Sequence, residues 1–271
     1  WVGAEVRNPA TRRMGFVQPT EGYMNFRWIT SIAGAKVRGA WFDHIECSAQ
    51  NFVDQAYQSV LAGARELTLF HLGDLVAAHP GDVSLADRLP ELRDLAAGLG
   101  NQKRRGVAFY KPAGSESDEN MYLADYLGML GLPILPVAKY PGDAKVAVLP
   151  VQAAHDPKLK EQARRHLERG VTLVVTPALL RKLGAEFAGW AGVQFSGECK
   201  PVQAESVTVG GNTIKLNLPL EMDGGLKADR CAVLLSASAG AESLPLLTRH
   251  VVGRGQLWVL DVRTCSEADF G

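Results

Sequence analysis

The stretch Val37–Leu72, VRGAWFDHIECSAQNFVDQAYQSVLAGARELTLFHL, predicts a strand, a helix and a second strand. Residues 37–45 are rich in apolar and aromatic side chains, which is typical of a buried parallel strand. Ser48 is a good helix N-cap, and apolar residues recur after it at helical spacing until Gly63, a residue that commonly ends helices. Residues 67–72 then supply the second strand.

Polar side chains gather where the first of these strands is expected to end: Asp43, His44 and Glu46. Both α/β barrels and doubly wound sheets carry their chemistry at the carboxyl ends of parallel strands. This polar cluster is therefore the first candidate for a functional site.

The segment before this stretch repeats the same order of elements. Residues 1–6 read as a strand, and residues 20–34 as a helix capped by Thr20 and ended by Gly34. Strands then recur about every 30–35 residues, the βα period of a parallel sheet. Three strands cannot close a barrel. Residues 1–80 are thus either a small open sheet or the last βα units of a larger TIM-like barrel.

Residues 81–105 read as a connecting helix and linker. The sequence His79-Pro80-Gly81-Asp82 interrupts the pattern, and residues 84–99 predict a helix that is kinked or begins afresh at Pro90. The run around residues 104–106 is the expected domain boundary.

Residues 106–271 predict a second α/β domain. Apolar runs indicate strands and intervening helices, with Asp156 as a helix cap, and this alternation predicts a doubly wound sheet. Around Gly210-Gly211-Asn212 the pattern alternates, which predicts a β-hairpin within an insertion at 192–222. The expected strands are 107–110, 133–138, 145–151, 171–175, 231–235, 247–252 and 256–262, and the expected helices are 121–130 and 157–169.

Composition disfavours several classes of function. The 29 basic and 29 acidic side chains give a formal net charge of zero, which disfavours nucleic-acid and anionic-membrane partners. No apolar run reaches the roughly 20 residues that span a bilayer. The four cysteines have no CxxC spacing, so we expect no metal site, and no phosphate or dinucleotide motif indicates a cofactor. The sequence does not identify the cellular compartment.

Three short segments carry a resemblance to a known family. The sequences WFDHIE (41–46), LAGA (61–64) and FHL (70–72) resemble the last two βα units of a clan A glycoside hydrolase barrel. The nearest architecture is that of the family 42 β-galactosidases, in which a glutamine-amidotransferase-like (flavodoxin-like) domain follows the barrel. Residues 106–271 resemble that domain. The resemblance implies a fragment of a β-galactosidase-like, retaining glycoside hydrolase.

The resemblance also assigns roles to residues. Glu46 takes the position of the catalytic nucleophile, while Phe70 and His71 take positions that line the sugar pocket. Asp43 and Glu5 are further candidates for substrate binding. A retaining enzyme needs two carboxyl groups about 5–5.5 Å apart, and the family's acid/base comes from a strand that this chain lacks. The implied partners are a carbohydrate and either a further copy of the chain or the N-terminal part of the same protein.

Plainer interpretations stand beside these. Glu46 could pair with Arg7 or Arg38 at a sheet edge, and His71 could be an ordinary core histidine. No cysteine lies on the strand-to-helix elbow that an amidotransferase needs, so the second domain is expected to be non-catalytic. The alternative function is a non-catalytic α/β module for oligomerisation or interaction.

Overall fold

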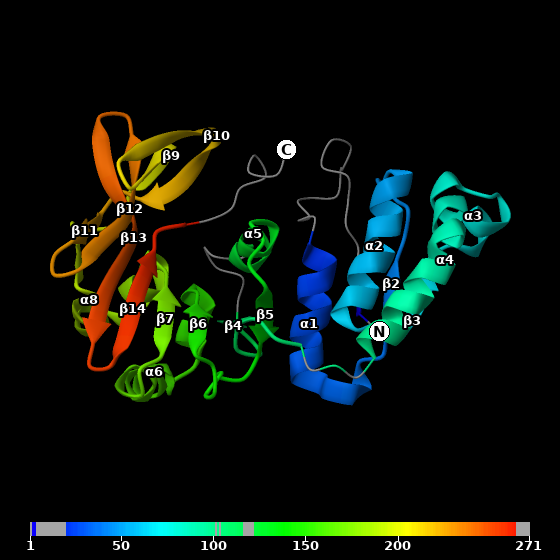
Figure 1. Ribbon diagram of the computed structural model, residues 1–271, viewed down its shortest axis with the longest axis horizontal. Coiled ribbons are helices and arrows are strands. Elements are labelled where there is room, and N and C mark those ends of the chain that lie inside the picture. The colour runs from blue at the N-terminus through cyan, green and yellow to red at the C-terminus, as the bar shows by residue number, and fades with distance from the viewer. Residues whose placement is uncertain (1, 4–19, 101, 103, 116–121, 264–271) are drawn as a thin grey trace. The chain divides into compact units, whose positions relative to one another are not determined.

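The computed structural model describes residues 2–3, 20–100, 102, 104–115 and 122–263 (Figure 1). The described residues divide into two compact units. The first holds the residues up to 106 together with 127–138, and the second holds 107–126 and the residues from 139 onward. Division of residues 1–105 into a barrel part and a linker stays a prediction.

A small parallel sheet forms the centre of the first unit. Strands β1 (Val2–Gly3), β2 (Gly39–Phe42) and β3 (Glu66–Leu69) pair in that order, with Phe42 opposite Leu69. Helix α1 (Glu21–Ala33), the 3-10 turn η1 (Gly34–Lys36) and helix α2 (Ala49–Ala62) connect the strands. The predicted βαβαβ order is therefore present, and β2 and β3 are shorter than expected.

Local capping fixes the ends of α2. The Ser48 hydroxyl accepts from the backbone N–H of Asn51 (3.1 Å), and the Asn51 side chain accepts in return from the Ser48 backbone N–H. At the other end Gly63 adopts a left-handed conformation with φ 103°, which glycine reaches at no steric cost. Thr20 precedes α1 as expected, but its side chain makes no capping hydrogen bond to that helix.

The connecting helix is longer than the sequence predicts. After the short helix α3 (Leu72–Val76), helix α4 runs unbroken from Pro80 to Leu99 and passes through Pro90. Of the two alternatives at Pro90, the fresh start is wrong, and the kink stays a prediction. His79 begins the helix instead, because its Nδ1 accepts from the backbone N–H of Gly81 (3.2 Å) and proline is favourable at the first helical position.

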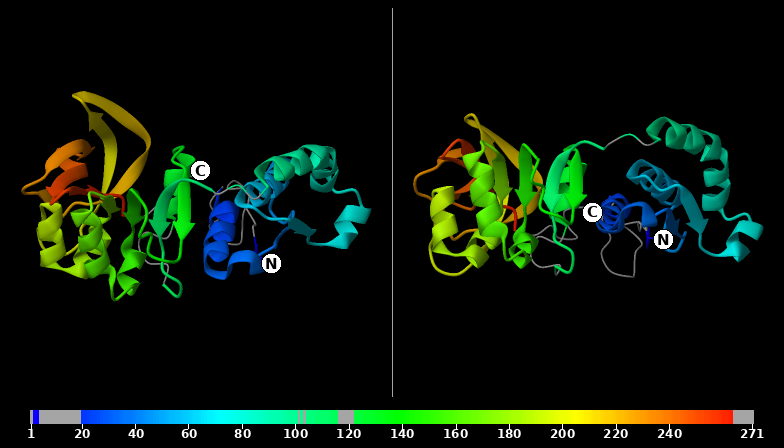
Figure 2. Two further views of the ribbon diagram at one scale, coloured as in Figure 1. Left: turned by 60° about the horizontal axis from the view of Figure 1, so that its bottom comes forward. Right: turned by 90° about the horizontal axis from the view of Figure 1, so that it is seen from below.

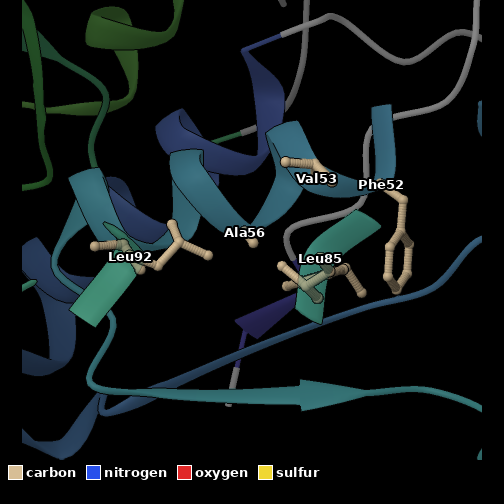
Figure 3. Packing of buried hydrophobic residues seen from close by; sticks show 7 residues of the cluster. Phe52, Val53, Ala56, Leu85 and Leu92 are labelled. Carbon is tan, nitrogen blue, oxygen red and sulfur yellow. The ribbon is translucent and has the colours of Figure 1, made fainter. Parts of the chain in front are cut away.

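Helix α4 packs against α2 through an apolar cluster (Figure 3). The rings of Phe42 and Phe52 meet edge to face, with centroids 5.3 Å apart. The buried members of this cluster are Phe42, Phe52, Val53, Ala56, Val60, Leu85 and Leu92. Helix α4, in the segment that the sequence predicts to connect the two domains, therefore contributes Leu85 and Leu92 to this cluster.

Parallel strands build one half of the sheet in the second unit. Strands β4 (Val107–Tyr110), β6 (Val146–Leu149), β7 (Thr172–Val175) and β14 (Gly255–Leu260) pair in parallel. The connecting helices are α6 (Leu159–Glu168), α7 (Pro177–Leu183) and α8 (Ala185–Ala191), and the 3-10 helix η2 (Val151–His155) precedes α6. Helix α5 (Leu123–Met129) and strand β5 (Ile134–Val137) lie where the sequence predicts them.

Antiparallel strands extend this sheet. Strand β14 is followed in the sheet by β13 (Glu242–Val252), β12 (Ala232–Ala239), β9 (Pro201–Val209) and β10 (Asn212–Asp223), the last at the edge. The predicted hairpin is present as β9 and β10, joined at Gly210 and Gly211, both with positive φ, and drawn in yellow and gold in Figure 2. A separate pair, β8 (Val193–Phe195) and β11 (Leu226–Ala228), completes the unit.

The predicted start of the helix at Pro157 needs a correction. Asp156 accepts the backbone N–H of Lys158 (2.8 Å), so its side chain closes a turn and α6 begins two residues later. The predicted α/β class is confirmed, and the sheet expected to be doubly wound is a larger mixed sheet with an antiparallel part.

Candidate active site

Two loops meet at the carboxyl edge of the small sheet. The backbone N–H of Phe70, just past β3, donates to the carbonyl of Phe42, the last residue of β2 (3.0 Å). The loops 43–48 and 70–79 therefore start side by side. This carboxyl edge, defined here as residues 43–48 and 70–79, holds four of the five side chains that the sequence nominates; Glu5 lies outside the described residues.

Asp43 organises the first loop. Its side chain is 3% exposed, and Oδ1 accepts from the backbone N–H of Ile45 (2.8 Å). Its backbone carbonyl accepts from Nε2 of Gln55, a buried residue of α2 (3.0 Å). These bonds tie the loop to the helix behind it. A role for Asp43 in substrate binding stays a prediction.

Glu46 lies in the turn that follows, four residues past the end of β2. Its backbone has φ 54°, an uncommon conformation for a residue other than glycine, and it is half-buried. Arg38, one of the two arginines considered as partners for it, lies 3.8 Å from Glu66 at the amino end of the strands. Arg7 lies outside the described residues.

An aromatic pair borders the second loop. The rings of Trp41 on β2 and Phe70 after β3 have centroids 6.3 Å apart and are inclined by 50°. Phe70 is 54% exposed, which is high for a phenylalanine. An exposed aromatic ring beside polar groups suits the apolar face of a sugar ring.

Two histidine rings approach one carboxylate at the same edge, and a third packs on one of them. Oδ2 of Asp74 contacts Nδ1 of His71 and lies 3.3 Å from Nε2 of His44. The ring of His79 packs on that of His44, with centroids 4.3 Å apart. His71 is exposed and has φ 86°, so it is not a core histidine, the plainer interpretation of this residue.

Asp74 and His79 are residues of this edge to which the sequence analysis assigns no role. Asp74 follows His71 by three residues, a spacing that brings side chains together on a helix but not on a strand. The sequence predicts strand up to Leu72, whereas the strand ends at Leu69 and α3 begins at Leu72. If a helix had been predicted from Leu72, the three-residue spacing would have indicated that His71 and Asp74 lie close together.

The second unit contains a buried ionic group of another kind. Arg181 on α7 makes two hydrogen bonds to the carboxylate of Asp223 (2.6 and 3.0 Å) and lies 4.1 Å above the ring of Phe195. The Asp223 backbone N–H donates to Oδ1 of Asp261 (2.9 Å). A hollow of about 560 Å³ beside this group is lined by residues of α7, α8 and β8 and by Asp229 and Arg230.

The part of the chain that the structure describes lacks two further kinds of feature. In that part of the chain no group of three or more His, Cys, Asp or Glu side chains is arranged to hold a metal ion. None of the helices described there is long and apolar enough to cross a membrane.

Two family models match the chain. Residues 1–88 match the model described as "Probable glycosyl hydrolase, catalytic domain", and residues 102–264 match "Uncharacterized protein SSO3021, second domain". The second match spans more than half of the chain. The chain belongs to the SSO3021 second-domain family. The boundary between the two matches falls close to the division of the structure at residue 106.

Solved structures share the fold at low sequence identity. A β-galactosidase from Bacillus circulans sp. alkalophilus has 16% identity and a TM-score of 0.62, over 98% of this chain and 48% of that one. The GH42 β-galactosidase Gan42B from G. stearothermophilus has 13% identity and a TM-score of 0.58, over 96% and 46%. An exo-β-1,4-mannosidase from Opitutaceae bacterium strain TAV5 has 12% identity and a TM-score of 0.56, over 98% and 55%.

These matches confirm the resemblance to family 42 β-galactosidases at the level of fold, and the catalytic-domain model supports it over the first unit. The chain spans about half the length of the structures that it matches. A comparison with curated proteins found no match.

Proposed function

We propose that this chain forms part of a retaining, β-galactosidase-like glycoside hydrolase and contributes its nucleophile, Glu46. The observation that carries the proposal is the match of residues 1–88 to a glycosyl hydrolase catalytic domain, over the same residues whose parallel strands gather polar side chains at one edge. Active sites of (β/α)₈ enzymes lie at that edge.

The chemistry assigned to Glu46 is a double displacement. Its carboxylate attacks the anomeric carbon while the glycosidic C–O bond breaks, and a second carboxylic acid gives its proton to the departing oxygen. That second residue, now a carboxylate, takes a proton from water, which releases the sugar from Glu46 with retained configuration. The acid/base comes from another segment. Phe70 and His71, with Asp43 and Glu5, are assigned to sugar binding.

The partner of the first unit is proposed to be further barrel strands of the same protein or a second copy of the chain. The carboxyl edge exposes large apolar side chains that water solvates poorly. They are Ile45 (42% exposed), Phe70 (54%), Leu72 (74%), Leu75 (50%) and Val76 (80%). Loops and helices of the completed barrel would cover part of this surface.

The second unit is proposed to be a non-catalytic, amidotransferase-like domain. A catalytic cysteine of that kind needs a sharp strand-to-helix turn. Cys199 lies between β8 and β9, and Cys231 directly precedes β12, so neither leads into a helix. Cys265 lies outside the described residues.

The test is replacement of Glu46 by Gly in the full-length protein that contains this chain. Glycine adopts φ 54° without strain, so E46G removes the carboxylate and leaves the turn intact. We expect turnover of 4-nitrophenyl β-D-galactoside to fall at least about a thousandfold. Added azide should restore product formation by attacking from the face that Glu46 has vacated, which gives the glycosyl azide of opposite configuration.

The matched control is Glu66→Gln, at the amino end of β3 and beside Arg38. It should leave turnover within about twofold because it is remote from the carboxyl edge. Unchanged turnover in E46G, with a normally folded protein, would remove Glu46 from the mechanism. The alternative, a non-catalytic interaction module, would then hold for this chain.

A further inference from the structure

The hollow in the second unit has polar and apolar walls that the proposed mechanism does not use. Its volume is about 560 Å³, within the range of sites that hold small molecules. It is bounded by α7, α8 and β8 and by the two residues that follow β11. All of these elements belong to the second unit, so the walls of the hollow are complete within that unit.

One wall of the hollow contains an arginine whose position is fixed. Nε and Nη2 of Arg181 donate to the carboxylate of Asp223 (2.6 and 3.0 Å), and Nη1 donates to the carbonyl of Gly197 (2.7 Å). These three bonds use three of the five N–H groups of the guanidinium. The side chain of Arg181 nevertheless remains 21% exposed. It can therefore donate to a ligand without first losing conformational freedom.

The same arginine lies over an aromatic ring. The guanidinium carbon of Arg181 is 4.1 Å from the centroid of the Phe195 ring, and Phe195 is partly exposed. Leu180, Ala188 and Val193 add buried apolar side chains to the same walls. Apolar surface thus lies next to hydrogen-bonding groups, a combination that suits the apolar face and the hydroxyl groups of a sugar ring.

The charges at the hollow are compensated in pairs. Asp223 balances Arg181, and Nε of Arg230 lies 3.4 Å from the carboxylate of its neighbour Asp229. Among the described residues that line the hollow, no charge lacks a counterpart, so the hollow does not favour a phosphate or a metal ion. Asp229 and Arg230 are 40% and 68% exposed, and so exposed a pair contributes little to stability. Both side chains can therefore turn to hydroxyl groups, which donate and accept, at small cost.

We propose that this hollow binds a neutral saccharide, whose ring lies on the apolar walls while its hydroxyl groups bond to Arg181, Asp229 and Arg230. The inference goes beyond the proposed function, because it requires neither Glu46 nor turnover. It gives the second unit a role of its own, the binding of carbohydrate.

The variant that tests this site fills the hollow. Gly189, on α8, lines it, and a Cβ added there would meet no atom beyond its own stretch of helix within 4 Å. Leucine has a higher helix propensity than glycine, so Gly189→Leu should fold normally while its side chain occupies the space. The matched control is Gly98→Leu, because Gly98 is an exposed glycine of α4 whose added Cβ likewise meets no atom.

The measurement is photoaffinity labelling of the full-length protein with an S-linked β-galactoside that carries a diazirine and resists hydrolysis. Peptide mass spectrometry should locate label in residues 180–195 or 226–230, and free galactose should displace it, whereas inorganic phosphate should not. G189L should lose most of this label, because leucine takes the place of the ligand, and G98L should keep it. Asp229→Ala should lose about fivefold, the effect of one missing hydrogen bond.

Three outcomes would overturn the proposal. They are label confined to other peptides, equal label in G189L and the unmodified protein, and displacement by phosphate but not by galactose. Turnover of 4-nitrophenyl β-D-galactoside should stay within about twofold in G189L, and a larger fall would show that the hollow is not separate from the catalytic machinery. Full turnover in E46G would remove Glu46 from the mechanism without changing the labelling, so the two proposals can fail independently.

Discussion

The backbone N–H of Asp223, at the end of β10, donates a hydrogen bond to Oδ1 of Asp261, just past the end of β14 (2.9 Å). Asp261 is fully buried, and burial raises its pKa well above the usual range, although the Asp223 N–H bond opposes this shift. The nearby Asp223 carboxylate raises the pKa further, and Arg181 lowers it. The protonation of Asp261 is therefore coupled to the folding of the second unit.

Asp261→Asn should flatten the pH dependence of stability. An unfolded aspartate loses its proton near pH 4, whereas folded Asp261 holds it to higher pH. From about pH 4 upward the folded state binds the extra proton, so the unfolding free energy falls as pH rises, by at most about 1.4 kcal/mol per unit. The D261N variant does not lose stability in this way, so its urea midpoint at pH 7 should be higher than that of the unmodified protein. If the unfolding free energy changed equally with pH from 4 to 7 in both proteins, Asp261 would not be the group responsible. The control is Asp229→Asn, because the Asp229 side chain is more exposed.

Arg181→Ala should destabilise the second unit strongly. Asp223 is 2% exposed, and the Arg181 guanidinium compensates its charge through two hydrogen bonds. Removal of one partner leaves a buried charge without compensation, which costs about 3–5 kcal/mol. Arg164→Ala, which breaks an exposed pair with Glu168, should cost less than about 1 kcal/mol. The double variant R181M/D223N should recover part of the loss; urea unfolding of all three measures this.

His166→Gln should reduce the loss of stability in acid. Nε2 of His166 donates to the carbonyl of Gly142 (2.7 Å), so Nδ1 is free to accept from the Tyr140 hydroxyl (3.0 Å), and the ring is neutral. Burial lowers the pKa of His166, against the Gly142 hydrogen bond, which raises it. The unfolded state therefore binds more protons near pH 6, and stability present above about pH 6.5 is lost as pH falls.

The check for this histidine is the urea midpoint at pH 7.5 and pH 5. The difference between the two midpoints should be smaller in H166Q than in the unmodified protein, although H166Q is less stable at both. Exposed His155→Gln should keep the original difference. An undiminished difference in H166Q would assign the acid sensitivity to other groups.

Much of the fold is predictable because its signals are local. Ser48 and Gly63 determine the ends of α2 through a capping box and a left-handed residue, and both act within a few residues of chain. Gly210 and Gly211 likewise determine the turn of the β9–β10 hairpin. The strands between these residues are predictable from runs of apolar side chains.

The strand ends were less predictable, since side chains compete there with the sheet. The expected strand 37–45 stops at Phe42 because the Asp43 carboxylate takes the backbone N–H of Ile45 and closes a turn. The expected strand 67–72 stops at Leu69, and His71 turns the chain with a positive φ. The apolar pattern continues past both residues, so a prediction from hydrophobicity alone places the strand ends too late.

The candidate site was predictable only in part. Strand order was enough to bring Asp43, Phe70 and His71 to one edge with Glu46 in the adjoining turn. The approach of Asp74 to His44 and His71 depends on α3, a five-residue helix too short to leave a periodic pattern. Contacts made by so short an element become visible only in three dimensions.

Leu85→Ala tests the packing of α4 on α2. Leu85 is 3% exposed within the cluster around Phe52, and its truncation should cost about 2–5 kcal/mol. Leu89→Ala, one turn later in the same helix and 38% exposed, carries the same change in helix propensity but should cost less than about 1 kcal/mol. Leu92→Ala, beyond Pro90 and 3% exposed, should resemble Leu85→Ala, because the helix continues through the proline. Urea unfolding would contradict that continuity if Leu92→Ala matched Leu89→Ala instead.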